Sequence, residues 1–192
     1  PVKSWYSWTG KQEDQDKDYM IGLTSGNIVL QGNQLIQPPD LVALFIIHEN
    51  LIPTGTMMLR QAILDVGGSV NSFEGNYEDV ALLTKLCLQY PAYIADECWY
   101  IYRQHPDSCT AIEGKAGLEL KSKLLFLSWA ESYLNEQKIS DKKVRKAIRS
   151  ARFHARYPGL RKCLEFSRIV LGAIKHRNLE TLRSHLASDG PH

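Results

Sequence analysis

The sequence predicts an α/β protein that continues into an α-helical extension. Apolar residues recur at helical spacing over 78–90, whereas aromatic and aliphatic residues alternate over 98–103, as they do in a strand. From about residue 113 the pattern changes to a series of amphipathic helices. We therefore expect an α/β domain over residues 1–112 and a basic α-helical extension over residues 113–192.

The amino-terminal part of the domain is polar and rich in turn-forming residues, and we expect only one short strand there, over 27–30. A helix is predicted over 41–47. Pro39 and Asp40 mark its start, because proline is favoured in the first turn of a helix and aspartate at its cap.

The middle of the chain alternates short strands and helices. In chain order we expect a strand over 54–59, helices over 60–66 and 78–90, strands over 92–95 and 98–103, and a loop over 104–110. Gly67 and Gly68 stop the first helix, because glycine readily adopts the left-handed conformation that ends a helix. Pro91 ends the second, because the residue before a proline disfavours helical backbone.

The extension is expected to hold three or four helices, at about 114–137, 140–155, 159–176 and 178–187. Between residues 142 and 183, thirteen Lys and Arg residues stand against only Glu165 and Glu180. Such helices suit either peripheral contact with anionic lipid head groups or a packed appendage whose basic face is solvated. No aromatic-basic interleaving or known reader motif supports binding to nucleic acid.

The composition is that of an ordinary globular protein, with 44% hydrophobic residues, 23% charged residues and a net charge of +2. Four cysteines occur without a CxxC pair or a histidine at finger-like spacing, which argues against a zinc site or a disulfide framework. No apolar run reaches the roughly 18–20 residues that span a bilayer, and no signal peptide is expected. We expect a cytoplasmic protein that lies, at most, at the inner face of the membrane.

The most informative block runs over residues 53–110. It contains, in order, a short strand leading into an arginine-containing helix start, VGGSVNSFEGNYED, an amphipathic helix ending in YP, and YRQHPDS. This order resembles the family 2 glycosyltransferases of the GT-A fold, and the WYSWTG and FLSWAESYL segments are similar to one bacterial branch of that family. The resemblance covers roughly residues 1–135. It implies the C-terminal, acceptor-side part of a GT-A fold, with a short mixed sheet.

The resemblance implies an inverting transferase that moves a sugar from a nucleotide-sugar donor onto a hydroxyl acceptor. The acceptor would be a saccharide or a lipid-linked molecule, and the usual setting is the synthesis of cell-surface polysaccharide or glycolipid. A divalent metal, Mg²⁺ or Mn²⁺, is expected for the complete enzyme.

Asp79 occupies the position where the family places the catalytic base. An inverting transferase has to deprotonate the acceptor hydroxyl as that oxygen attacks the anomeric carbon. Asp79 lies in the first turn of the helix over 78–90, where the helix dipole favours an ionised carboxylate. Glu78 is expected to position the acceptor or to brace the loop. The alternative is that an acidic residue in a first turn only caps the helix.

Arg103, His105 and Ser108 form the second expected cluster. In the family this segment can fold over the diphosphate, where Arg103 would pair with phosphate oxygens and His105 would donate a hydrogen bond or ligate the metal. The alternative is that Arg103 pairs with a core carboxylate and that His105 makes a turn with Pro106.

Four further residues are expected to bind substrate, namely Thr56, Gly67, Gly68 and Trp99. The glycine pair would let the backbone approach the acceptor closely, or would only cap a helix. Threonine is common in strands without a function. Trp99 and Tyr100 alternate along a strand, so we expect one of them in the core.

Asp14, Asp16 and Asp18 spell two overlapping DxD patterns, but a polar segment precedes them instead of an apolar strand. We interpret them as a solvated charged turn. The strand-loop-helix unit that holds the nucleotide and the DxD motif that binds the metal are not found in the sequence. We therefore expect this chain to lack the N-terminal nucleotide-binding half and to be inactive as an isolated fragment. The competing hypothesis is a non-catalytic scaffold or binding module with a basic tail that binds a membrane or a partner.

Overall fold

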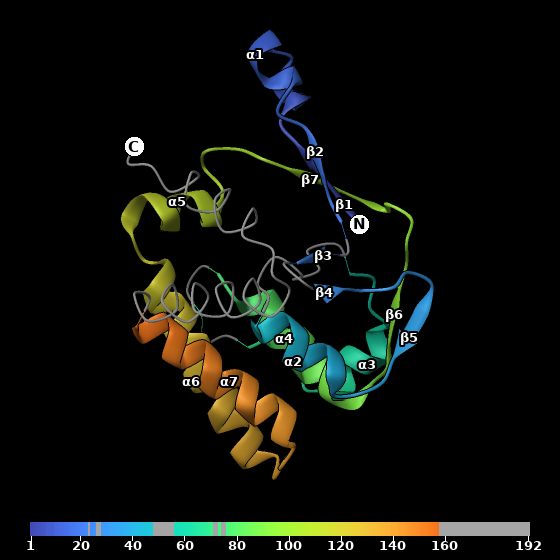
Figure 1. Cartoon of the computed structure of the whole chain (residues 1–192), viewed down its shortest axis with the longest axis vertical. Helices are drawn as coiled ribbons and strands as arrows, with labels where there is room; N and C mark the ends of the chain where they lie inside the picture. Colours follow the sequence, from blue (N-terminus) through green and yellow to red (C-terminus); the bar gives the residue numbers. More distant parts are fainter. Residues whose placement is uncertain (23, 26–27, 48–55, 71–72, 74–75, 158–192) are drawn as a thin grey trace, which may run out of the picture. The chain divides into compact units, whose positions relative to one another are not determined.

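The computed structural model describes residues 1–157, apart from 23, 26–27, 48–55, 71–72 and 74–75 (Figure 1). The contacts within the chain divide it into two units, Pro1–Arg152 and Phe153–His192. The first unit combines helices with small sheets, so the predicted α/β class is confirmed.

The strand β1 (Val2–Trp5) is the centre of a three-stranded sheet. It pairs antiparallel with β2 (Tyr19–Ile21) and parallel with β7 (Tyr100–Arg103), so the sheet is short and mixed, as expected (Figure 1). The sequence did not predict β1 or β2. The parallel partner of β1, β7, is almost a hundred residues away in the sequence. Of the four side chains of β1 only that of Ser4 is fully buried, so the sequence shows no alternation of buried and exposed residues there.

Two strand pairs complete the sheets of the described residues. β5 (Gln34–Ile36) pairs antiparallel with β6 (Ala92–Ile94), and β3 (Thr24–Ser25) pairs antiparallel with β4 (Ile28–Val29). β4, β6 and β7 therefore confirm three predicted strands, each shorter than expected.

The prediction of a strand over 54–59 is wrong for residues 56–59. Residues 54–55 lie outside the described residues. Residues 56–59 form no strand. Met57 and Leu59 are 78% and 80% exposed, so the apolar character that suggested a buried strand belongs to a surface segment.

The helices of the described residues are η1 (Ser7–Thr9), α1 (Gln12–Gln15), α2 (Asp40–Ile47), α3 (Arg60–Asp65), α4 (Glu78–Gln89), α5 (Cys109–Ala116), α6 (Glu119–Glu136) and α7 (Lys142–Arg156). The predictions for α2, α3, α4 and α7 are confirmed. The helices expected over 159–176 and 178–187 lie outside the described residues. No helix in the described part of the chain is both long and apolar enough to cross a membrane.

Two boundaries differ from the prediction. α5 begins inside the expected loop over 104–110, because the hydroxyl of Ser108 accepts a hydrogen bond from the backbone N–H of Ala111 (3.2 Å) and caps a helix there. The helix expected over 114–137 is also divided. Gly117 ends α5 with a φ of 67°, and α6 starts two residues later.

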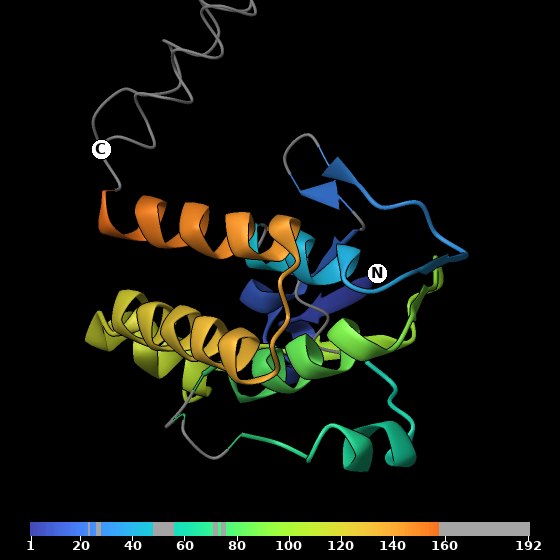
Figure 2. The same cartoon turned by 90° about the horizontal axis from the view of Figure 1, so that it is seen from below.

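The core of the first unit lies among α2, α4, α6 and α7. Its fully buried side chains include Phe45 on α2, Leu83 on α4, Leu127 on α6 and Ile148 on α7. Figure 2 shows α6 and α7 running side by side. The first unit thus continues past residue 112, the expected end of the α/β domain, while the division into a transferase part and an extension stays a prediction.

Candidate functional site

The α4 helix presents Glu78 and Asp79 at the surface. Both residues are exposed and form the first turn of the helix. The residue before them, Tyr77, has a φ of 82° and provides no capping side chain. One oxygen of Asp79 instead accepts a hydrogen bond from the N–H of Val80 (2.8 Å). The carboxylate therefore does part of the work of a cap, and it remains accessible at the surface.

Aromatic packing fixes the segment that leads into α4. The ring of Tyr77 stacks on Phe126 with 5.1 Å between centroids, and Phe73 packs edge-on against Trp129 at 5.7 Å. Phe126 and Trp129 belong to α6, within the FLSWAESYL segment whose resemblance was noted above. The aromatic residues of that segment thus hold the backbone from which Asp79 projects.

A buried glutamate ties the same segment to α5. Glu113 is only 7% exposed, and its carboxylate accepts hydrogen bonds from the side chain of Asn76 (2.7 Å) and the hydroxyl of Ser122 (2.8 Å). The backbone N–H of Asn76 also donates to Glu113 (3.4 Å), and Thr110 donates to the amide oxygen of Asn76 (3.4 Å). Sequence reasoning did not identify Glu113 as a site residue, since an isolated glutamate in a helix carries no motif.

These hydrogen bonds bring the two expected clusters to the same region. Asn76 is three residues before Asp79, and its partner Thr110 is two residues after Ser108. The backbone just before α4 is therefore joined to α5, the helix that follows the 103–108 segment in the chain. That Asp79 and the 103–108 segment act on one substrate stays a prediction.

Within the second cluster, Arg103 lies at the end of β7 and its guanidinium stacks over the ring of Trp8 at 5.0 Å. The indole N–H of Trp8 donates to the backbone oxygen of Gln104 (2.6 Å), which fixes that stacking partner. His105 is half-buried, and its backbone oxygen accepts a hydrogen bond from the N–H of Ser108 (3.2 Å), so it does form a turn.

The residues that the structure describes include no group of three or more His, Cys, Asp or Glu side chains able to hold a metal ion. His105 therefore has no set of co-ligands there. The described residues thus offer no cluster for Mg²⁺ or Mn²⁺, and the divalent metal expected for the complete enzyme stays a prediction.

Gly67 and Gly68 close α3 as a helix cap, which was one of the two expected roles. Their φ values are 75° and 69°, and their N–H groups donate to the backbone oxygens of Leu64 (2.9 Å) and Ile63 (2.8 Å). This is the hydrogen-bond pattern of a Schellman motif. The buried amine of Lys85 donates to the backbone oxygen of Gly68 (2.7 Å), and burial lowers the pKa of Lys85.

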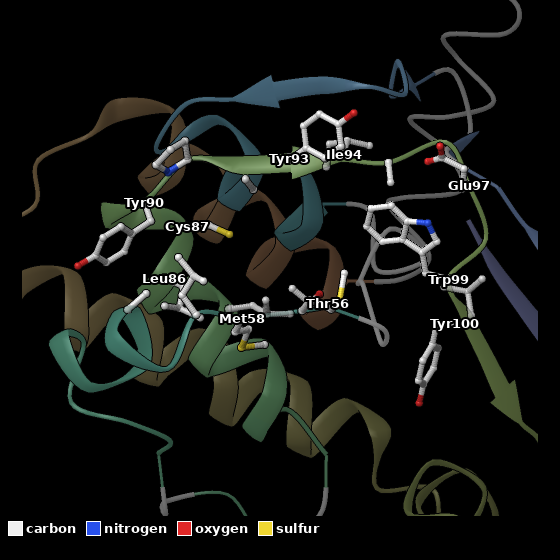
Figure 3. A pocket seen from close by; sticks show the side chains of 18 of the residues that line it. Thr56, Met58, Leu86, Cys87, Tyr90, Tyr93, Ile94, Glu97, Trp99 and Tyr100 are labelled. Atoms are coloured by element: carbon white, nitrogen blue, oxygen red, sulfur yellow. The ribbon is translucent and has the colours of Figure 1, made fainter.

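A groove of about 520 Å³ lies between the α3–α4 region and the segment that contains β6 and the start of β7 (Figure 3). Two expected substrate-binding residues, Thr56 and Trp99, both line it, although 43 positions separate them. Trp99 is 60% exposed and Tyr100 is 36% exposed, so the expectation that one of the two lies in the core is wrong; both line the groove.

The α4 helix connects this groove to Asp79. The groove is lined by Leu83, Leu86 and Tyr90, which follow Asp79 by four, seven and eleven residues. These offsets fall on one face of an α-helix, so Asp79 occupies the N-terminal end of the face that lines the groove. Leu83 is about 6 Å along the helix axis from Asp79.

The acidic stretch near the amino end serves the fold. Asp18 accepts hydrogen bonds from the backbone N–H groups of Tyr6 (2.7 Å) and Ser7 (3.0 Å) and pairs with Lys3 (3.1 Å). Asp14 accepts hydrogen bonds from Thr9 and Lys17. These carboxylates stabilise the η1 and α1 turns.

Comparisons of the chain with protein-family models, with curated proteins and with solved structures each found no match.

Proposed function

We propose that this chain forms the acceptor side of an inverting sugar transferase with a GT-A fold, in which Asp79 is the catalytic base. The observation that carries the proposal is the position of Asp79. Asp79 is exposed at the end of the α4 face that lines the groove, and Asn76, three residues before it, is hydrogen-bonded to Glu113 and Thr110 of α5. The mixed sheet with parallel β1 and β7 is compatible with that fold.

In the proposed reaction the Asp79 carboxylate takes the proton of the acceptor hydroxyl. The acceptor oxygen forms a bond to the anomeric carbon while the bond from that carbon to the nucleoside diphosphate breaks, which inverts the configuration. The freed electron pair and charge pass to the diphosphate. Arg103, an exposed residue at the end of β7, would pair with the phosphate oxygens.

The proposed enzyme also needs a nucleotide-binding part, whose motifs residues 1–192 do not show. Sugar transfer should therefore be assayed with an enzyme in which residues 1–192 are joined to a nucleotide-binding part. For the chain by itself, isothermal titration with uridine and guanosine diphosphate-sugars and Mn²⁺ should show no micromolar binding.

Asp79→Asn in that enzyme should abolish transfer of radiolabelled sugar, by about a hundredfold or more, and leave donor binding intact. An asparagine has almost the same shape as aspartate and cannot take the proton. Glu78→Gln is the matched control, because Glu78 is equally exposed in the same helical turn, and it should weaken acceptor binding more than turnover. Transfer retained by Asp79→Asn would remove Asp79 from the role of base.

A further inference from the structure

The groove beside α4 has two ends of different chemistry. Figure 3 shows Glu97, Trp99 and Tyr100 gathered at one end, and Leu86, Cys87 and Tyr90 at the other. Among the described residues that line the groove, Glu97 is the only one with a charged side chain. The lining is otherwise mainly apolar or aromatic, and the adaptable side chain of Met58 lies between the two ends (Figure 3).

Two tyrosine hydroxyls that line the groove already donate their protons within the protein. The hydroxyl of Tyr90 donates to Asp65 (2.7 Å), and that of Tyr93, along the upper wall, donates to Asn33 (3.0 Å). Burial raises the pKa of the Cys87 thiol to about 11, so this group stays neutral. A ligand at this end therefore meets apolar surface, which suits a hydrocarbon chain.

The other end suits a neutral hydroxylated group. The exposed indole of Trp99 offers a flat surface, and the Glu97 carboxylate can accept hydrogen bonds from hydroxyl groups. The same carboxylate repels a phosphate at contact distance. This combination matches the face and the hydroxyls of a sugar better than it matches a phosphorylated head group.

We propose that the groove binds a glycolipid acceptor, with a neutral sugar on Trp99 and Glu97 and an apolar chain directed toward Leu86 and Cys87. This inference rests on the proposed function and names its acceptor class. The order along α4 supports the direction, because Leu86, Cys87 and Tyr90 are progressively farther from Asp79 than Leu83 is. The apolar chain thus points away from the proposed base.

Calorimetric titration of this chain with octyl glucoside below its micelle concentration tests the proposal. Octyl glucoside should bind at one site, glucose alone should show no saturation, and octyl phosphate should bind several-fold more weakly than octyl glucoside. Trp99→Ala should weaken octyl glucoside binding by about tenfold, while Trp99→Phe retains most of it because the ring stays. Glu97→Gln should remove the discrimination against octyl phosphate.

Ile112→Ala is the matched control, because Ile112 is 55% exposed on α5 and does not line the groove, and it should leave binding unchanged. Trp99 is exposed, so its substitution should leave the circular dichroism spectrum of the folded chain intact. Three results would overturn the proposal: glucose binding as tightly as octyl glucoside, octyl phosphate binding more tightly than octyl glucoside, or Trp99→Ala leaving the affinity unchanged.

This binding experiment separates the two proposals. If octyl glucoside binds but the longer enzyme transfers no sugar, the proposal for the groove is supported and the proposed transferase function is refuted. If the longer enzyme transfers sugar but this chain binds no alkyl glycoside, only the proposal that the groove binds a glycolipid is refuted.

Discussion

At the scale of single residues, the candidate site depends on polar groups whose partners lie far away in sequence. Glu113 joins Asn76 to Ser122, and thereby joins the segment before Asp79 to α5 and α6. Its carboxylate is buried, and the hydrogen bonds shown for it come from neutral donors. Such a residue stabilises only while every partner remains in place.

Glu113→Ala should lower the free energy of unfolding by about 1–3 kcal/mol, because it removes the acceptor for the half-buried side chains of Asn76 and Ser122. Urea denaturation followed by fluorescence measures this change. Glu113→Gln keeps an acceptor oxygen and should recover much of the loss. Equal stability of the alanine variant and the parent chain would show that these hydrogen bonds do not hold the segment.

Asp18 gives the chain a specific acid sensitivity. The backbone N–H of Ser7, followed by that of Tyr6, holds the pKa of Asp18 well below its ordinary value of 3.8. A carboxyl whose folded pKa is depressed stabilises the fold above its unfolded pKa, and that contribution disappears as the pH falls through the folded value.

Asp18→Asn should therefore lower the thermal midpoint near neutral pH, and the difference from the parent chain should shrink as the pH is lowered below 3.8. Calorimetric melts over a pH series follow this trend. Asp16→Asn, an exposed position in the same stretch, is the control and should leave the midpoint unchanged. A difference for Asp18→Asn that stays constant down to strongly acidic pH would contradict the role of the ionised form.

At the scale of elements, sequence patterns predicted the pieces whose signals are local. The apolar spacing of α4, the Asp40 start of α2 and the glycine pair after α3 each act within a few residues, and each is confirmed. β1 was missed because its partner β7 lies far along the chain. The start of α5 was placed too late because a single cap hydrogen bond, which the Ser108 hydroxyl accepts from the N–H of Ala111, decides where it begins.

The groove could be predicted only in part for a related reason. Thr56 and Trp99 were expected to bind substrate, but the pattern did not place them together, and it put Thr56 on a strand that is absent. Met57, Tyr93 and Glu97 were not expected to form a site. Exposed apolar side chains look like core residues in a sequence, and only the packed helices decide which of them remain outside.

The same glycine substitution should have opposite effects in two elements. Gly67→Ala should destabilise the chain by about 1 kcal/mol, because a φ of 75° is unfavourable for any residue with a Cβ, although the nearest atom, Nζ of Lys85, is 3.9 Å away. Gly114→Ala, inside α5, should instead stabilise by up to about 1 kcal/mol once the flexible carboxylate of Glu119 shifts slightly. Thermal denaturation compares the two, and effects of the same sign would contradict the assigned backbone conformations.

At the scale of the whole molecule, the first unit has one core to which α2, α4, α6 and α7 all contribute. The basic residues of α7 follow from this packing. Val144 and Ile148 are buried, so Lys142, Lys146 and Arg149 are left exposed, while Arg152 pairs with Glu131 (2.6 Å). This part of α7 is therefore a packed helix with a solvated basic face, which was one of the two expected alternatives.

Ile148→Ala should therefore destabilise the whole first unit, by about 2–4 kcal/mol, instead of only fraying α7. The reason is that Ile148 is 2% exposed in the same cluster as residues of α2 and α4. Urea unfolding followed both by far-ultraviolet dichroism and by tryptophan fluorescence should give coincident transitions at a lower midpoint. A helical transition that separates from the fluorescence transition would show that α7 folds independently.

The enzyme proposal finally requires that Asp79 and the groove act on one ligand. Titration of the ¹⁵N-labelled chain with octyl glucoside, followed by NMR, tests this requirement. The indole N–H of Trp99 and the backbone amides of Asp79 and Val80 should shift together and saturate at the same ligand concentration, whereas the amide of Ile112 should not move. A saturating shift at Trp99 with no change in the first turn of α4 would contradict the assignment of Asp79 as the acceptor-side base.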